Sequence, residues 1–259
     1  MGRKWLFIGG MVAVSMVTVG FLLKKGPVDC FGAAQGIEIP EYGADEDIVV
    51  HVGYTASYNH VTLVPDWVAW ELTAAELEGQ VECSYSFSRD PDVRPPKASR
   101  EDYSHSGWDK GHMAPRADME WANIAMEESY YFTNICPQDH EMNAGAWQKI
   151  ERLTRRVACH KERVYVVCGP VFTTHRHGTI GEAKVQVPDA FFKALAVADG
   201  SRMQTVGFLM DNTPQTSSPR HYAVSVDSVE AVIGRNLFPR CSEENEQSFD
   251  WNFWERNSY

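Results

Sequence analysis

Short apolar strands that alternate with two helical segments constrain the fold of this chain more than any other feature of its sequence. A helix is predicted from Asn143 to about His160, followed by a buried strand at Val164–Cys168. A second helix is predicted at Val226–Ile233, started by Asp227 or Ser228. Further strands are predicted at Val49–Val52, Tyr58–Leu63, Trp67–Leu72, Lys184–Val187, Phe192–Ala198 and Gln204–Met210. Strands interleaved with helices predict a mixed α/β, or α+β, sheet domain.

Composition is that of a folded protein with one main domain. Of 259 residues, 44% are hydrophobic and 23% are charged, and no low-complexity tract indicates disorder. The stretch over 26–47 is rich in Gly, Pro and acidic residues and lacks a sustained period. We therefore predict a linker over 26–47 and a single domain over 48–259.

The first 25 residues have the pattern of a membrane anchor or signal segment. Two basic residues precede an uncharged run over 5–23, and two lysines close it. Its nineteen residues meet the roughly 17–25 that a spanning helix needs, whereas a cleaved signal has an apolar stretch of about 7–15. An uncleaved anchor over 1–25 is favoured over cleavage near Gly32-Ala33-Ala34. We expect a membrane-anchored or secreted protein whose domain lies outside the cytoplasm.

The cysteines predict no particular disulfide. Six of them are spread over two hundred residues without close pairing, at Cys30, Cys83, Cys136, Cys159, Cys168 and Cys241. Since Cys168 lies within a predicted buried strand, a free core thiol is expected there.

The formal net charge of −11 limits the partners of this chain. Lys and Arg that neutralise phosphates supply much of the affinity for nucleic acids, so an acidic chain makes a poor stable binding module. An enzyme must release its product and can recruit positive charge locally through a divalent ion. The charge therefore counts against a binding module more than against a hydrolase.

The residues most specific for chemistry lie in two stretches. The first reads Trp-Asp-Lys-Gly-His-Met-Ala-Pro over 108–115, and the second starts with Asn-Ala-Gly-Ala-Trp at Asn143 and reaches Glu151. A histidine delivered by a glycine turn beside a cation, facing a helix with an amide and a carboxylate, has the parts needed for metal-assisted phosphodiester hydrolysis.

Three of these residues have the chemistry for distinct tasks. His112, with an ordinary pKa of about 6.5, is mostly neutral at physiological pH and can take a proton from water. Asn143 offers a hard carbonyl oxygen, which Mg²⁺ accepts while keeping most of its waters. Glu151 lies about 80° round a regular helix from Asn143 and about 12 Å along it, so it can face the same cleft and hold a metal-bound water.

These stretches resemble the DNA/RNA non-specific endonuclease family, the endonuclease G-like branch of the ββα-metal superfamily. Its Asp-Arg-Gly-His signature corresponds to Asp109-Lys110-Gly111-His112, its Asn-rich segment to 131–138, and its Asn-x-x-Ala-Trp…Glu run to Asn143, Ala146, Trp147 and Glu151. The resemblance covers roughly residues 48–240. It implies a central antiparallel sheet flanked by helices, with an inserted ββα-metal active-site motif.

The resemblance also implies a role for each matching residue. His112 would be the general base and Asn143 the direct magnesium ligand, with Glu151 supporting the water shell of the metal. Asn134 would help to position the site. Lys110 stands where the family has Arg, and it would offer phosphate a compact single charge in place of a planar fork.

Other polar residues around these motifs admit simpler interpretations. Arg89 is a loosely aligned candidate for an arginine that the family uses upstream of its signature. His175 and His177 are expected in a solvated loop. On the helix of Asn143, a regular α-helical geometry places Lys149, Arg152 and Arg156 on a solvated face and leaves Arg155 best able to reach substrate. Trp147 and Ile150 are expected to be core residues that orient the helix.

The activity that the resemblance implies is hydrolysis of DNA and RNA with little sequence preference, using Mg²⁺, for which Mn²⁺ can substitute. The family resemblance also allows a homodimer, and the N-terminal segment would contact a membrane. One alternative is a weak or inactive relative that binds nucleic acid at a surface, and intact His112, Asn143 and Glu151 speak against it. Another is a metal-dependent hydrolase of a different phosphodiester or of a peptide. A zinc protease is disfavoured because a His-Glu-x-x-His run is absent.

Overall fold

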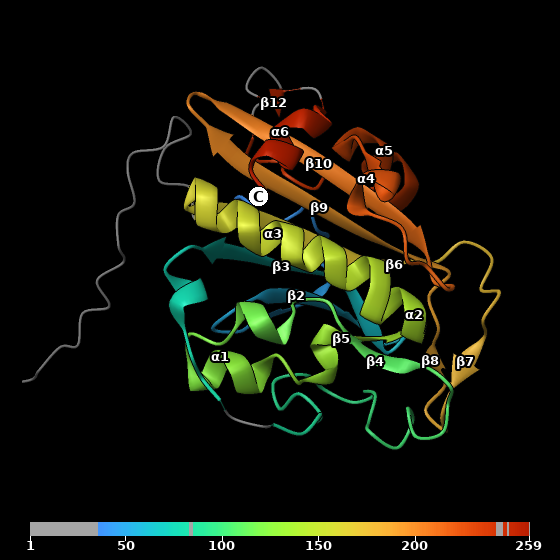
Figure 1. The fold of residues 1–259 in the computed structure, drawn as a ribbon. Coiled ribbons are helices and arrows are strands. Elements are labelled where there is room, and N and C mark those ends of the chain that lie inside the picture. The colour runs from blue at the N-terminus through green and yellow to red at the C-terminus, as the bar shows by residue number, and fades with distance from the viewer. Residues whose placement is uncertain (1–35, 83–84, 242–245, 248, 259) are drawn as a thin grey trace, which may run out of the picture.

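The computed structural model describes residues 36–82, 85–241, 246–247 and 249–258 (Figure 1). The predicted anchor over 1–25 lies outside these ranges. Among the residues described, no helix is both long enough and apolar enough to cross a bilayer. The described part of the predicted linker, 36–47, packs on the domain, where Ile37 is 1% exposed and belongs to a core cluster.

The fold is a mixed α/β architecture built on one large antiparallel sheet, as predicted. Its main path runs β1-β2-β3-β6-β9-β10-β11, and every neighbouring pair on that path is antiparallel. The short β12 (Glu246–Gln247) pairs in parallel with β10. The strands of the path are β1 (Asp47–Val50), β2 (Thr55–Asn59), β3 (Val64–Thr73), β6 (Arg163–Val171), β9 (Ala190–Asp199), β10 (Arg202–Asp211) and β11 (Ala223–Val224).

Both faces of this sheet are buried. Side chains alternate between the two faces along each strand, so each strand contributes to both cores. On β3, Val68 and Trp70 enter the larger core, whereas Trp67 and Ala69 enter the smaller one on the other face. The long helix α3 (Gln148–Lys161) covers the first face and crosses in front of the sheet in Figure 1. Helix α5 (Val226–Ile233) packs on the second through Val226 and Val229. Burial on both sides explains why the central strands read as continuous apolar runs.

Most predicted strands exist, and their errors lie at the ends. The predicted strand Tyr58–Leu63 is wrong after Asn59, whose Oδ1 accepts the backbone N–H groups of Val61 and Thr62. The chain turns there and passes through Leu63 at φ 59° before β3 begins. Helix α5 occupies its predicted span, but its N-cap is Ser225, which accepts from the N–H of Ser228.

Several elements were not anticipated. They are short or polar, so their apolar period is weak. They comprise β4 (Asp109–His112), β5 (Ile135–Gln138), β7 (Thr179–Ile180), α1 (Asn123–Glu128), α2 (His140–Met142), α4 (Pro219–Tyr222), α6 (Trp251–Arg256) and 3-10 turns at Glu76–Glu78, Arg116–Asp118 and Phe132–Asn134. The strand predicted at Lys184–Val187 is present in shorter form as β8 (Val185–Gln186). Helix α6 buries Phe253 and Trp254 in the larger core, which ties down the C-terminal segment.

The thiol and histidine expectations hold in the described part of the chain. Cys168 is buried and unpaired, and burial raises the pKa of its thiol to about 12. His175 is exposed and His177 is partly so, in the loop between β6 and β7.

That loop is organised by one buried carboxylate. Asp189 accepts the backbone N–H groups of Thr173, Thr174 and His175 on Oδ2 at 2.7 to 2.9 Å, and that of Arg176 on Oδ1 at 2.9 Å. Burial alone would raise the pKa of Asp189, but these four donors outweigh it and hold the pKa well below its ordinary value. The charged carboxylate therefore stabilises the folded loop.

We predict that Asp189→Asn lowers the free energy of unfolding at pH 7 by about 2 to 4 kcal/mol, because backbone donors lose a charged acceptor. The pKa of Asp189 is lower in the folded state than in the unfolded state. The stability of the wild type relative to Asp189→Asn is therefore at its maximum above the ordinary pKa of 3.8 and declines as the pH falls below it. Urea denaturation at pH 7 and pH 3 measures both effects. Asp199→Asn, which removes a partly exposed ion pair with Lys161, is the control and should cost less than about 1 kcal/mol.

Candidate functional site

A two-stranded ribbon followed by a helix forms the core of the site. Strands β4 and β5 pair antiparallel, with Asp109 opposite Gln138 and His112 opposite Ile135. After β5 the chain enters α2, then a π-helical turn at Asn143–Trp147, then α3. Gly111 is required within the ribbon, since a Cβ there would lie 1.9 Å from Oε1 of Gln138. The two sequence stretches are thereby brought together in a ββα arrangement.

His112 lies at the end of β4 with its ring packed among aromatic side chains. The ring centroids of Phe87 and Tyr130 are 5.3 and 5.2 Å away, and Tyr130 meets the imidazole edge to face. Its Nε2 is buried and has no hydrogen-bond partner in the described structure. Burial, followed by the charge of Arg116, lowers the pKa of His112 to about 4. The imidazole is therefore neutral at physiological pH and offers an uncommitted nitrogen.

Backbone contacts hold the segment around His112 in place. The indole Nε1 of Trp147 donates to the His112 carbonyl at 3.2 Å, which ties β4 to the helix. The Asn134 amide, fully buried, accepts from the N–H of Ala114 and donates to the carbonyls of Ala114 and Ser129, each at 2.8 Å. Because these contacts occupy the Asn134 amide, this residue positions the chain beyond His112.

Asn143 is oriented by a carboxylate from the ribbon. Its Nδ2 donates to Oδ2 of Asp109 at 2.9 Å, and that oxygen also lies 2.9 Å from Nδ1 of His140. This contact fixes which end of the amide faces Asp109 and leaves the Asn143 carbonyl oxygen available. A hard neutral oxygen fits Mg²⁺, which can complete its shell with water and substrate. The described residues hold no cluster of three or more metal-ligating His, Cys, Asp or Glu side chains, so a multi-carboxylate metal cage is absent from that part of the chain.

The π-helical turn changes the geometry expected for Asn143 and Glu151. A separation of about 80° assumed a regular α-helix, but Asn143 begins a turn with the wider i→i+5 pattern. Glu151 follows in the first turn of α3 and is half-buried. Desolvation raises its pKa to about 7, against the lowering effect of Lys193, while Asp118 adds a further rise.

A buried charge network lies next to Glu151. Lys193 on β9 is 1% exposed, and its Nζ lies 4.2 Å from the Trp147 ring centroid and 5.3 Å from that of Trp70. Asp118, 2% exposed, accepts from Arg155 at 2.9 Å and from the Trp70 indole at 3.2 Å. The prediction that Arg155 is best placed to reach substrate is therefore wrong, because Asp118 holds its guanidinium.

The other predicted cations occupy different surroundings. The Nζ of Lys110 lies 5.6 Å from the ring centroid of Phe87, which also packs on His112, so both residues share one aromatic wall. Arg89 is exposed and lines a separate hollow with Glu101 and Asp102, and His112 is not among the described residues that line it.

Sequence reasoning missed three contributors to this site. Asp109 belongs to the Asp-Lys-Gly-His motif, but its contact with Asn143 joins residues 34 positions apart, so the sequence alone does not reveal it. Arg116 follows His112 by four residues, and its effect on the imidazole depends on the fold of the turn between them. Lys193 was hidden in an apolar strand, where a lone lysine among aromatic residues was the available signal, since lysine is rarely buried without a partner.

Comparison with known proteins identifies the relatives of this chain. The family model for DNA/RNA non-specific endonucleases matches residues 35–244. The chain belongs to the DNA/RNA non-specific endonuclease family. It is 31% identical over 240 residues to the mitochondrial nuclease EXOG of Xenopus laevis, covering 85% of this chain and 64% of that protein. It is 29% identical to mitochondrial endonuclease G of Bos taurus, covering 84% and 83%. The chain thus spans less than two thirds of the length of the EXOG relative.

A solved structure shows the same fold. A chain from the crystal structure of the EndoG/EndoGI complex superposes with a TM-score of 0.73 at 23% identity, covering 85% of this chain and 93% of the other. The family and the antiparallel α/β fold predicted from the sequence are both confirmed.

We predict that Glu151→Gln raises the free energy of unfolding of the metal-free protein at pH 8. The folded pKa of about 7 lies above the ordinary 4.5, so stability present below pH 4.5 is lost as the pH rises toward 7 and the buried carboxylate ionises. Solvent access to this half-buried group limits the gain to about 1 to 2 kcal/mol. Thermal unfolding with chelator from pH 4 to 8 measures it, with exposed Glu182→Gln as the control. Parallel curves for wild type and Glu151→Gln would contradict the assignment.

Proposed function

We propose that this chain is a magnesium-dependent endonuclease that hydrolyses the phosphodiester bonds of DNA and RNA, with His112 as its general base. The observation that carries the proposal is the neutral His112 imidazole with a free Nε2, on the ribbon whose following helix presents the Asn143 carbonyl oxygen. The names of the relatives, nuclease EXOG and endonuclease G, support the same activity.

The reaction begins when His112 takes a proton from a water molecule. The resulting hydroxide oxygen forms a bond to phosphorus as the bond from phosphorus to the 3′ oxygen breaks, leaving a 5′-phosphate. The departing 3′ oxygen takes a proton from solvent water to become a 3′-hydroxyl, and His112 returns its proton to solvent. The low pKa of His112 keeps the base unprotonated, although it also makes it a weaker base than a solvated histidine. Magnesium on Asn143, which Mn²⁺ can replace, would stabilise the charge on phosphate and on the leaving oxygen.

Nearby charged side chains divide the remaining tasks. Glu151 would hold a water of the metal shell, and a cation bound next to it would favour the charged form of its carboxylate. Lys110 and Arg116 supply positive charge on either side of His112 along the chain. Lysine at 110 would contact one phosphate oxygen without the fixed fork of an arginine.

The proposed location of the protein rests on the sequence pattern of the first 25 residues. The nuclease domain, 48–259, is proposed to act outside the cytoplasm, anchored by the segment over 1–25 or released from it. An inactive surface-binding relative is the alternative. The uncommitted nitrogen of His112 and the oriented amide of Asn143 favour the enzyme, because a binding module needs neither.

We predict that His112→Ala cuts plasmid DNA and RNA about 10³-fold more slowly than wild type in Mg²⁺, because general base catalysis is lost. Chelator should stop the wild-type enzyme, and gel assays of both substrates measure the rates. His160→Ala removes an exposed histidine at the end of α3 and should cut normally. Intact nucleic acid after incubation with wild type and Mg²⁺ would refute the nuclease assignment. Equal rates for His112→Ala and wild type would refute the base.

We predict that Asp109→Ala raises the Mg²⁺ concentration for half-maximal activity by about 10- to 100-fold, because the Asn143 amide loses its orienting partner. Asp109→Asn keeps an acceptor for Nδ2 and should show a smaller change. Titration of the cleavage rate with Mg²⁺ measures both. An unchanged half-saturation in Asp109→Ala would show that Asp109 does not orient the ligand.

A further inference from the structure

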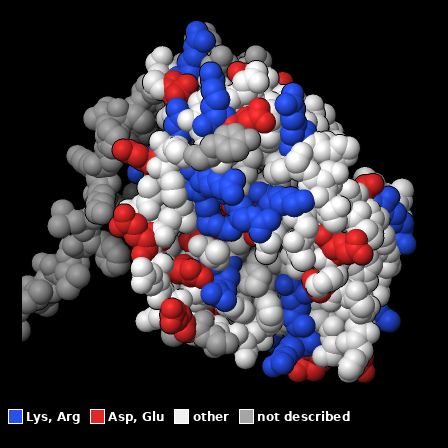
Figure 2. All heavy atoms as spheres, in the orientation of Figure 1, with Lys and Arg blue, Asp and Glu red and all other residues white. Residues whose placement is uncertain are grey.

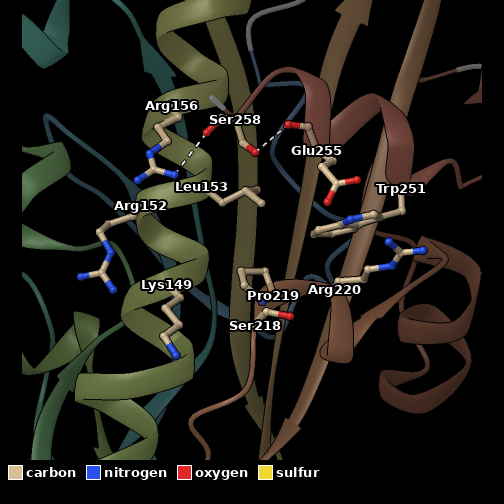
Figure 3. A pocket seen from close by; sticks show the side chains of 10 residues that line it. All are labelled: Lys149, Arg152, Leu153, Arg156, Ser218, Pro219, Arg220, Trp251, Glu255 and Ser258. Carbon is tan, nitrogen blue, oxygen red and sulfur yellow. Dashed lines mark hydrogen bonds between the residues drawn. The ribbon is translucent and has the colours of Figure 1, made fainter.

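A basic pocket lies between α3 and the C-terminal segment, apart from the residues assigned to catalysis (Figure 3). Its volume is about 370 Å³. One wall comes from α3, another from α4 and a third from α6 and the residues after it. The lining consists of Lys149, Arg152, Leu153, Arg156, Ser218, Pro219, Arg220, Trp251, Glu255 and Ser258. The family match ends at residue 244, so α6 adds a wall from beyond the matched region.

Four cations converge on this pocket. Lys149, Arg152 and Arg156 are spaced i, i+3 and i+7 on α3, which aligns them along one side of the helix. Arg220 on α4 stands across from them in Figure 3. The blue side chains gathered over α3 in Figure 2 mark this face as strongly positive.

These cations have no carboxylate partner within the described residues. Lys149, Arg152 and Arg156 donate to neutral oxygens, those of the Thr216 carbonyl, the Gln148 amide and the Ser258 carbonyl. Several cations elsewhere do have carboxylate partners, as in the ion pairs Arg116–Glu120, Arg155–Asp118, Lys161–Asp199, Arg163–Glu71 and Arg235–Glu46. In a protein with a net charge of −11, positive charge concentrated and left unpaired here marks a place for an anionic ligand.

An aromatic side chain completes the lining. The half-buried indole of Trp251 projects from α6 into the pocket, beside Leu153 and Pro219 (Figure 3). Its Nε1 is buried without a hydrogen-bond partner in the described structure. Glu255 is the one carboxylate of the lining, so the pocket is not positively charged on every side. Cations beside an indole and an apolar surface fit a ligand with both phosphates and an unstacked base.

We propose that this pocket binds a segment of single-stranded nucleic acid, with phosphates on the α3 and α4 cations and a base against Trp251. The inference rests on the proposed nuclease function, because α3 also carries Glu151 and one strand would follow the helix from the catalytic centre. From Lys149 to Arg156 the helix rises about 10 Å, so its cations form a line long enough to contact more than one phosphate of a strand. The pocket then favours substrates that are single-stranded beside the scissile bond.

Binding of a labelled twelve-residue oligothymidylate to the full chain, measured by fluorescence anisotropy with chelator present, tests the cationic part. Arg156→Gln/Arg220→Gln should weaken binding, and the slope of log affinity against log salt should fall in magnitude by about 1.4, or about 0.7 per lost contact on a single strand. The control Lys184→Gln/Arg202→Gln removes two exposed charges outside the pocket and should leave the slope unchanged. Equal affinity and slope in both double variants would overturn the proposal.

Trp251→Leu tests the base contact. It should weaken oligothymidylate binding about tenfold, through the loss of one stacked base, and leave binding of a blunt duplex unchanged. Equal losses on the strand and the duplex would overturn the single-strand assignment.

A small chromogenic phosphodiester separates this proposal from the nuclease function on which it rests. It should be hydrolysed at the wild-type rate by the pocket variants, since it reaches only the catalytic centre, and not by His112→Ala. If the wild type fails to cleave it or any nucleic acid, the nuclease function fails, whatever the anisotropy shows. If cleavage is normal and the pocket variants bind as the wild type does, the pocket proposal alone fails.

Discussion

The hydrogen bond from the Trp147 indole to the His112 carbonyl is the contact on which the rest of the site depends. It joins β4, a short strand without apolar side chains, to the helical segment that packs on the large sheet. Trp147 is completely buried, so its indole cannot move without disturbing Phe191 and Lys193 beneath it. The base on β4 and the amide at Asn143 are therefore held by one rigid side chain between them, with Asn134 fixing the chain on the far side of His112.

The charges beneath the helix show how the same packing tunes the chemistry. Lys193 lies under two tryptophan rings, and its positive charge partly offsets the burial of Glu151. Asp118 also faces this region, but Arg155 and the Trp70 indole satisfy it. Of the two carboxylates, Glu151 makes no hydrogen bond among the described residues that would hold it in the charged form, whereas Asp118 does. Glu151, which lacks such contacts, is the residue assigned to the metal shell. A cation bound there would therefore stabilise its charged form more than that of Asp118.

The fold was predictable from sequence wherever both faces of a strand are buried, as at Val164–Cys168, because the apolar run is then long and continuous. Strand β4 escaped prediction because its sequence, Asp-Lys-Gly-His, lacks apolar residues and serves the site. Strand β5 is buried, but it is only four residues long and contains Pro137, which weakens a strand pattern. His112 and Asn143 could be singled out because their motifs are local. Arg155 could not be placed correctly, since its partner Asp118 is 37 residues away and nothing near either residue indicates the contact. The predicted angle between Asn143 and Glu151 holds only for a regular α-helix, and no residue in Asn-Ala-Gly-Ala-Trp indicates a wider turn.

That wider turn makes the number of residues in this helix as important as their identity. A π-helical turn holds one more residue than an α-helical turn. The extra residue lets α2 stay aligned with the β4–β5 ribbon while α3 stays aligned with the large sheet. Removing Ala144 would let the turn close into a regular α-helix and rotate Asn143 by about 100° relative to Trp147 and Glu151. The sequence on both sides would be unchanged, yet the amide would face away from the base. A deletion at this point is therefore expected to disrupt the site, even though Ala144 itself is exposed to solvent.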